Sequence, residues 1–284
     1  MLELKKILLP VDFSERSEGS ARYAQAIASH FNSHIVLLHV EHDPFLVGSD
    51  DLKGPPIGSI EHTLWLKGRL ESFLKDELEG LTVTRMVVEG DPATKIVELA
   101  RAEAVDLIVM PTSGHRAIRQ FLWGSVVAKV LHDSHCPVWT GVHLAEAPAA
   151  NLLSFRKLAC AIDLGPHTRS TLCWAAEFAA AFEALLLVIH IVRPAASERI
   201  QASTRNLELE LVNRARGEIE NLLANLEIKA EIAVGFGSAP ELVHEFTLGF
   251  AADALVMGRC AASGRLHSDT FTIIRQSHCP VVSV

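Results

Sequence analysis

The stretch KKILLPVDFSERSEGSARYA, which begins at Lys5, recurs in altered form as RKLACAIDLGPHTRSTLCWA from Arg156. Asp12 in the first copy therefore corresponds to Asp163 in the second, 151 residues later. Three further blocks recur in the same order: HIVLLHV (34–40) with LLLVIHI (185–191), VDLIVM (105–110) with ADALVM (252–257), and SHCPV at 134 and again at 277. Matched blocks in one order, separated by small changes in length, indicate that one domain has been duplicated.

The length of the chain also predicts two domains. It has 284 residues, and domains usually contain about 100 to 200 residues each. The segment HLAEAPAANLLS, from His143, is rich in Ala and Pro and has no sustained period, which is typical of a linker. We place the boundary near Ala149, which divides the chain into domains 1–148 and 149–284.

Apolar runs alternate with helical periodicity within each copy. In the first copy strands are predicted at 6–11, 35–40, 81–88, 106–110 and 136–140, and helices at 17–31, 61–78, from Pro92 onward and at 121–131. Strands that are continuously apolar and alternate with helices indicate a parallel sheet covered on both faces. The predicted fold class is α/β, with two tandem open five-stranded parallel sheets.

Charge and composition argue against several partners. The chain has 34 acidic and 26 basic residues, a formal net charge of −8, and such a charge repels nucleic acid. The apolar stretch from Thr171 to Val192 contains Glu177 and Glu183, and acidic side chains argue against a membrane span. Five widely spaced cysteines, an odd number, predict a reducing, cytoplasmic location.

Polar residues and glycines follow two strands that are expected to be central in the sheet. Asp12 ends the first strand, and PTSGHRAIRQFLWGS (111–125) follows the fourth. Gly114 and Gly124 flank nine residues, and Ser125 opens a predicted helix. Glycine lets backbone N–H groups approach an anion, and a helix N-terminus offers unpaired donors with partial positive charge. The pattern predicts a phosphate cradle where ligands bind in open parallel sheets.

These motifs resemble the universal stress protein family. The resemblance consists of a strand ending in Val-Asp, a glycine followed after nine residues by Gly-Ser, and then Cys-Pro-Val, and it extends over nearly the whole chain as two copies. It implies strand order 3-2-1-4-5, an adenine nucleotide alpha hydrolase-like fold, dimers formed through the fifth strands, and ATP binding in one branch. Carried over to matching positions, it assigns Asp12 to the adenosine, Val40 to the adenine through its backbone, and four residues to the phosphates: Gly114, Gly124, Ser125 and Val126.

The sequence departs from the family pattern in both copies. In the first copy Pro111 stands where the ATP-binding branch has its first glycine, and proline has no N–H to donate. The hydroxyl of Thr112 or Ser113 is a substitute to be considered. In the second copy Ala261 and His267 stand at glycine positions. We therefore expect one nucleotide site, in the first copy, and a degenerate motif in the second.

The resulting functional prediction is an ATP-binding, nucleotide-dependent regulator of a stress response. No catalytic residue is identified, so the chain is at most a weak ATPase, and Mg²⁺ would accompany the ATP. The alternative is a tandem interaction scaffold that does not bind nucleotide. In either case strands 136–140 and 279–283 are predicted to pair edge to edge as an internal pseudo-dimer, and a homodimer is left open.

Several of these signals have structural explanations that stay open. Asp12 could serve only to cap the first helix. The fourteen histidines have no recognised metal-ligand spacing, so no metal site is assigned. The segment GFGSAP (235–240) imitates a dinucleotide fingerprint, but Pro240 occupies the third glycine position, so we interpret the segment as a turn.

Overall fold

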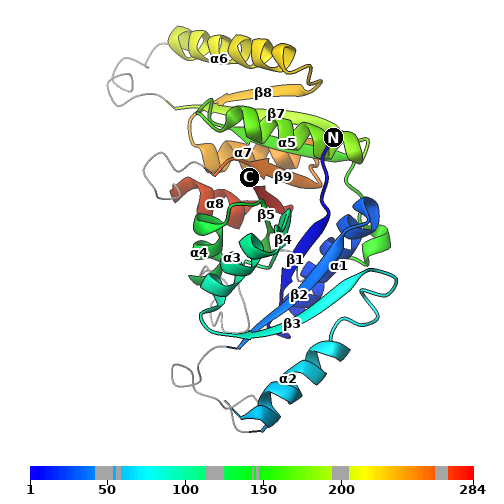
Figure 1. Ribbon diagram of the computed structural model, residues 1–284. Coiled ribbons are helices and arrows are strands. Elements are labelled where there is room, and N and C mark those ends of the chain that lie inside the picture. Colours follow the sequence, from blue (N-terminus) through cyan, green and yellow to red (C-terminus); the bar gives the residue numbers. More distant parts are fainter. Residues whose placement is uncertain are drawn as a thin grey trace. The chain divides into compact units, whose positions relative to one another are not determined.

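The structure is a computed structural model that describes residues 1–41, 54–55, 59–112, 125–142, 144, 147–193, 205–259 and 268–284. The chain divides into two compact units, Glu3–Leu153 and Ser154–Val284, the latter joined by Met1–Leu2. Each unit is described by itself (Figure 1).

The first unit alternates strands and helices. Its strands are β1 (Lys6–Pro10), β2 (His34–Glu41), β3 (Val83–Glu89), β4 (Leu107–Val109) and β5 (Val138–Thr140). Its helices are α1 (Glu15–Phe31), α2 (Ile60–Ser72), α3 (Pro92–Ala102), α4 (Ser125–Asp133) and the short 3-10 helix η3 (Ala150–Leu152). The strands lie in the order β3-β2-β1-β4-β5, and the pairs are parallel.

The second unit repeats this arrangement. Its strands are β6 (Lys157–Ile162), β7 (Leu185–Val192), β8 (Glu231–Phe236), β9 (Ala254–Met257) and β10 (Val281–Ser283). Its helices are α5 (Thr168–Ala181), α6 (Arg205–Asn225), α7 (Ala239–Phe250) and α8 (Ser268–Gln276). The order β8-β7-β6-β9-β10 is again parallel. The predicted α/β class, the parallel sheets and the strand order 3-2-1-4-5 are confirmed in both copies.

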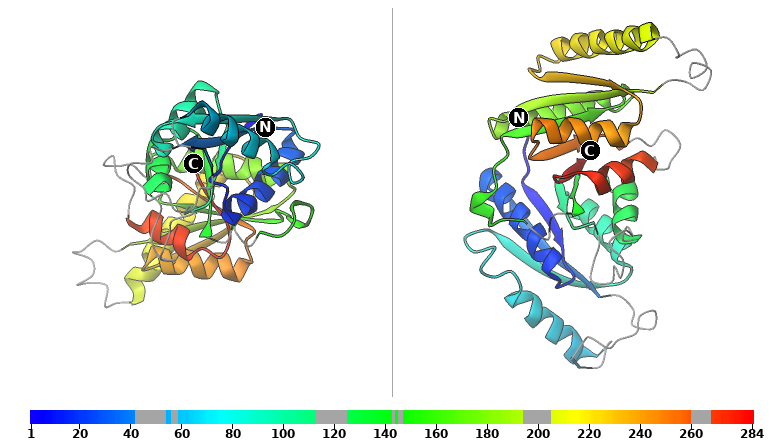
Figure 2. Two further views of the ribbon diagram at one scale, coloured as in Figure 1. Left: turned by 90° about the horizontal axis from the view of Figure 1, so that it is seen from below. Right: turned by 180° about the vertical axis from the view of Figure 1, so that it is seen from behind.

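Each sheet is covered on both faces. Ile7, Leu8 and Leu9 of β1 are consecutive and have no exposed surface, which a strand achieves only when both of its faces are packed. The last two helices of each unit pack together, α3 against α4 and α7 against α8. The first two helices lie on the opposite face (Figures 1 and 2). The helices change face because every crossover is right-handed and the connection after the third strand returns across the sheet in the opposite direction.

The duplication extends to unusual backbone conformations. Glycines with strongly positive φ begin the matched turns after the third strands, Gly90 at 142° and Gly237 at 139°. Three pairs of non-glycine residues at matched positions also have positive φ: Phe13 with Leu164, Asn32 with Glu183, and Ala104 with Ala251. The turn at Gly237 lies within GFGSAP, in agreement with the interpretation of that segment as a structural turn.

A carboxylate that binds the start of each central strand is the second duplicated feature. Oδ2 of Asp106 accepts hydrogen bonds from the backbone N–H groups of Lys5 and Lys6, at 2.8 and 2.9 Å. In the second unit Oδ2 of Asp253 accepts from Arg156 and Lys157, at 2.7 and 2.8 Å. Each carboxylate therefore connects the beginning of the fourth strand of its unit to the beginning of the first.

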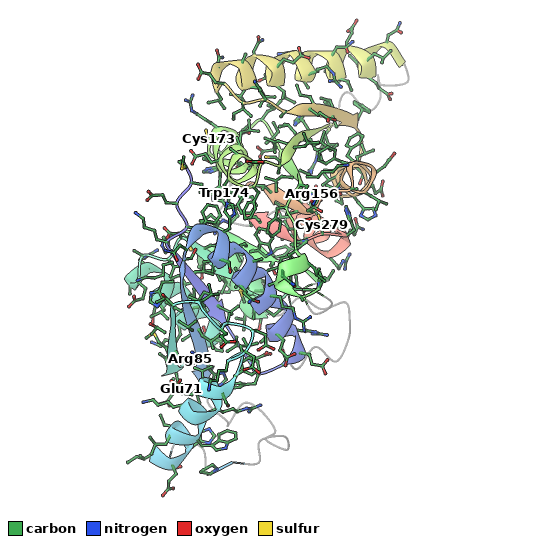
Figure 3. The ribbon with its side chains drawn as sticks, turned by 90° about the vertical axis from the view of Figure 1, so that its right-hand side faces the viewer. Glu71, Arg85, Arg156, Cys173, Trp174 and Cys279 are labelled. Carbon is green, nitrogen blue, oxygen red and sulfur yellow. The ribbon has the colours of Figure 1, made fainter. Side chains whose placement is uncertain are left out.

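The helix boundaries differ from prediction at α2, which was expected to run to Leu78 and ends at Ser72. Phe73 is extended and Leu74 has a φ of +57°. Leu74 and Leu78 are nonetheless buried, so turns continue the apolar spacing that looked helical. Arg85 of β3 connects the two elements, because its Nε donates to the carbonyl oxygen of Leu70 at 3.1 Å (Figure 3).

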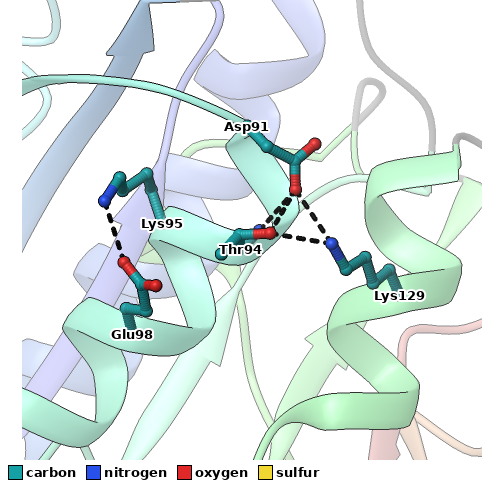
Figure 4. A network of polar contacts seen from close by, with 5 residues as sticks. All are labelled: Asp91, Thr94, Lys95, Glu98 and Lys129. Atoms are coloured by element: carbon teal, nitrogen blue, oxygen red, sulfur yellow. Dashed lines mark hydrogen bonds and ion pairs between the residues drawn. The ribbon is translucent and has the colours of Figure 1, made fainter.

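The start of α3 agrees with prediction. Asp91 is the N-cap and Pro92 opens the helix. Oδ1 of Asp91 accepts a hydrogen bond from the N–H of Thr94 at 3.0 Å and receives Nζ of Lys129, from α4, at the same distance (Figure 4). These contacts hold the pKa of Asp91 at about 2, chiefly through the side chain of Thr94. One carboxylate thus connects two helices on the same face of the sheet.

Candidate functional site

Asp12 follows β1 and begins the short segment that leads to Ser14, the N-cap of α1. Its Oδ1 accepts hydrogen bonds from the N–H and Oγ of Ser14, at 3.2 and 2.5 Å, and from Oγ of Ser17 at 2.8 Å. Asp12 therefore stands at the start of the capping segment, as the structural alternative expected, while the N-cap itself is Ser14. The carboxylate stands at the carboxyl end of a central strand, where the sheet order reverses between β1 and β4, and this is the place where ligands bind in open parallel sheets.

Phe13, His39 and Arg69 form a cluster that begins with the residue after Asp12. The next residue, Phe13, lies in the left-handed region at φ 60°, a conformation that costs a bulky residue free energy. Its ring packs 4.5 Å from the His39 ring, centroid to centroid, and the Arg69 guanidinium lies 4.1 Å from the Phe13 centroid. Sequence periodicity does not reveal such a cluster, because its members come from three separate elements.

His39 is held by the backbone. Its Nδ1 lies 2.9 Å from the carbonyl oxygen of Val11, and because a carbonyl only accepts, Nδ1 carries the hydrogen. Burial lowers the pKa of His39. The matched His190 makes the same contact with Ile162 at 3.0 Å. Both histidines therefore bond a backbone carbonyl at the end of a strand.

Val40 lies near the end of β2, on the crevice side of the sheet. The last residue pair between β1 and β2 is Pro10 with Leu38, whereas β2 continues to Glu41 and pairs with β3 throughout. Val40 therefore lies beyond the edge of β1 and is partly exposed, a position from which its backbone could contact a planar ligand.

Pro111 and Thr112 follow β4. Thr112 is buried, and its Oγ1 lies within 3.4 Å of the carbonyl oxygen of Gly141. This hydroxyl already has a backbone acceptor, which makes Thr112 a poor substitute for the missing glycine contact. Gly114, Gly124 and Ser113 lie outside the described residues.

Ser125 and Val126 open α4. Ser125 is exposed and Val126 is partly exposed. The N–H groups of these two residues belong to the first turn of the helix. An uncharged first turn leaves the positive end of the helix available to an anion, and α4 has no acidic residue there.

A cavity of about 460 Å³ lies at the corresponding place in the second unit. Asp163, Ile191 and Asp269 line it, and these residues match Asp12, Val40 and Val126 in the repeat. His190 and Gly258, the counterparts of His39 and Pro111, line it as well. The sequence predicted that the glycine motif of this copy is degenerate, but it did not predict a cavity of this size.

The charge at the start of α8 differs from that of α4. Asp269 lies in the first turn of α8 and forms an ion pair with Arg193, which follows β7. In the first copy the position of Asp269 is the uncharged Val126. The acidic side chain already compensates the partial positive charge at the helix N-terminus. The electrostatic attraction that this charge would offer an anionic ligand is therefore reduced.

The described residues provide neither a metal cluster nor a membrane-spanning helix. Within the described ranges no group of three or more His, Cys, Asp or Glu side chains is placed to hold a metal ion. The helices of the described part contain none that is long and apolar enough to cross a membrane. The four described cysteines, Cys136, Cys160, Cys173 and Cys279, are free thiols.

Comparison with known proteins identifies a family for both halves of the chain, and relatives. The profile of the Universal stress protein family matches residues 3–140 and 154–284. The chain is 35% identical over 140 residues to Universal stress protein MJ0531 of Methanocaldococcus jannaschii, an alignment covering 47% of this chain and 79% of that protein. Universal stress protein MJ0577 of the same organism is 33% identical over 151 residues, covering 47% and 92%.

A solved structure supports the tandem fold. The crystal structure of a universal stress protein from Archaeoglobus fulgidus DSM 4304 matches with a TM-score of 0.70 and 21% identity, covering 99% of this chain and 96% of that one. The profile matches both halves, and the fold match spans almost the whole chain. The chain therefore belongs to the universal stress protein family, with one family domain in each half.

Proposed function

We propose that the first unit binds ATP and that its occupancy regulates what the protein contacts during stress in a reducing cytoplasm. Asp12 and Val40 would hold the adenosine, and Gly114, Gly124, Ser125 and Val126 the phosphates. Mg²⁺ would accompany the bound triphosphate.

The observation that carries the proposal is the cavity of the second unit. Three separate elements bring the counterparts of Asp12, Val40 and Val126 to one cavity of about 460 Å³, which is in the usual range for small-molecule sites. Because the two copies share strand order and backbone conformation, the same three positions are expected to face one crevice in the first unit.

The difference in charge supports the choice of the first unit for the phosphates. The first turn of α4 is uncharged, whereas that of α8 contains Asp269. Pro111 removes one N–H from the rim of the cradle, which predicts weaker binding than a complete glycine motif would give and leaves the other donors in place.

Isothermal titration of the full chain with Mg²⁺-ATP tests the proposal. Gly124→Val should abolish the heat of binding, because a branched side chain blocks the approach of the phosphates. Ala161→Leu, which alters the cavity of the second unit, is the matched control and should leave ATP affinity unchanged. Absence of binding in the wild type, or equal affinity in Gly124→Val, would refute the assignment.

Slow hydrolysis is tested in the same samples. ADP release is followed over hours, with Gly124→Val as the background. A rate in the wild type above that background would make the protein a weak ATPase, and equal rates would leave it a binding protein.

The second candidate is a scaffold that does not bind nucleotide, which Pro111 at the cradle rim favours. The pairing of the two fifth strands into an internal pseudo-dimer, the further formation of a homodimer and the domain boundary near residue 149 belong to this proposal. A chain that binds no ATP, yet retains a stable two-domain arrangement in solution scattering with and without nucleotide, would favour the scaffold.

A further inference from the structure

The cavity of the second unit combines an apolar interior with a polar rim. Ile189, Val243 and Ile273 contribute apolar surface. Thr171 and Thr270, with 1% and 4% exposure, add buried side chains that carry hydroxyls. Cavities with apolar walls and a few placed polar groups are typical of sites for small organic ligands.

The rim retains the groups that would hold a sugar and a base. Oδ1 of Asp163 accepts hydrogen bonds from the N–H of Gly165 at 2.8 Å and from Oγ1 of Thr168 at 3.3 Å, so the carboxylate has a fixed orientation at the cavity. His190 donates from Nδ1 to a backbone carbonyl. In the neutral ring its Nε2 is therefore an acceptor. Both groups accept hydrogen bonds from hydroxyl or amino groups.

The opposite end of the cavity carries an ion pair. Asp269 and Arg193 both line the cavity and pair with each other, with side chains 30% and 54% exposed. Arg193 is thus already paired, and among the described lining residues Asp163 and Asp269 outnumber it, which leaves an excess of negative charge there. A phosphate entering here would meet two carboxylates and a helix end that is already compensated.

We infer that the second-unit cavity binds an uncharged nucleoside and that the Arg193–Asp269 pair rejects its phosphorylated forms. The inference rests on the proposed function in one respect, because the nucleoside is chosen from the correspondence of Asp163 with Asp12. The two copies would then be specialised, one for the nucleotide and the other for the nucleoside that remains when phosphates are removed.

Titration of the full chain with adenosine and with AMP tests this inference. The wild type should bind adenosine at the second unit, and Ala161→Leu should weaken that binding at least about tenfold because the larger side chain occupies the cavity. AMP should bind this cavity more weakly than adenosine. Absence of adenosine binding, binding that is unchanged in Ala161→Leu, or equal affinity for AMP at this cavity would overturn the inference.

Variants of the ion pair test the rejection of phosphate. Asp269→Asn keeps the shape of the side chain, and Asp269→Val installs the residue found at the matched position 126. Both should raise AMP affinity relative to adenosine by roughly tenfold, because Arg193 and the helix end become available. An unchanged ratio in both variants, with thermal melts that show folded protein, would overturn the role of the pair.

The two proposals fail in different ways. Loss of ATP binding in Gly124→Val concerns only the first unit, whereas the adenosine signal that Ala161→Leu removes concerns only the second. A wild type that binds no ATP but binds adenosine in the Ala161-sensitive manner would refute the proposed function and support this inference.

Discussion

Nζ of Lys129 on α4 lies 3.0 Å from Oδ1 of Asp91, the N-cap of α3. Asp91→Ala removes this contact and the cap together and should lower the free energy of unfolding by about 1 kcal/mol. Asp91→Asn keeps an acceptor for the N–H of Thr94 and should cost less. Lys129→Ala isolates the half-exposed ion pair and should cost roughly 0–1 kcal/mol. Urea denaturation measures all three, and an Asn variant as unstable as the Ala variant would contradict the capping role.

Acid should weaken this same cap. The folded-state pKa of Asp91 is about 2, below its ordinary value of 3.8, so its stabilising contribution is present above pH 3.8 and is lost as the pH falls through the folded-state value. The difference in stability between wild type and Asp91→Ala should therefore be constant near neutral pH and shrink towards pH 2. Urea titrations at several pH values measure this difference, and one that grows on acidification would contradict the assignment.

The duplicated carboxylates at the strand starts should be strongly stabilising. Asp253→Ala leaves the N–H groups of Arg156 and Lys157 without their acceptor and should cost about 2–3 kcal/mol, since bonds to charged groups exceed neutral ones. Asp253→Asn retains an oxygen and should cost about half as much. Asp106→Ala is the matched variant in the first unit. Calorimetric melting is the measurement, and an Ala variant as stable as wild type would show that water replaces these bonds.

Two glycine substitutions should have opposite signs. Gly237 has a φ of 139°, so Gly237→Ala should destabilise by about 1–3 kcal/mol through backbone strain. Gly217 lies within α6, and a Cβ there would meet nothing within 4 Å. Gly217→Ala should therefore stabilise the protein by about 0.5–1 kcal/mol. Thermal denaturation of the two variants gives the comparison, and a shift of the same sign in both would refute the argument.

The cysteines should differ in reactivity. Burial raises the pKa of Cys279 to about 11 and also raises the pKa of Cys160, so both are protonated and covered at pH 8. Cys173 is partly exposed on α5, and Figure 3 marks it with Cys279. A maleimide reagent followed by peptide mass mapping should label Cys173 before the other three described cysteines, Cys136, Cys160 and Cys279, which are buried. The urea-unfolded chain should lose this order, and equal labelling of the folded chain would contradict it.

Most of the fold could be predicted because it depends on local patterns. Buried strands such as β1 are apolar without interruption. The start of α3 is signalled by two adjacent residues, Asp91 as the N-cap and Pro92 in the first turn. The strand order came from the family resemblance, since the periodicity of β1 or β4 does not say which strand lies beside which.

The site was less predictable because it depends on side chains that meet across the sheet. Asp12 was found from a strand end and Val40 was assigned by the family resemblance, but the contact of Phe13 with Arg69 joins residues far apart in sequence. The end of α2 at Ser72 was missed because Leu74 is buried in a turn at a helical spacing. The Arg193–Asp269 pair was missed because neither residue belongs to a recognised motif.

The paired carboxylates Asp106 and Asp253 lie at the opposite end of their strands from the ligand crevice. The carboxylates that stabilise the strand starts are therefore separate from the residues around the crevice. Substitutions around the crevice leave the hydrogen bonds of Asp106 and Asp253 in place. After a gene duplication, this separation allows one half to accumulate substitutions around its crevice while the other half keeps its original residues there. The same separation allows residues around the crevice to be exchanged between the two halves by mutagenesis.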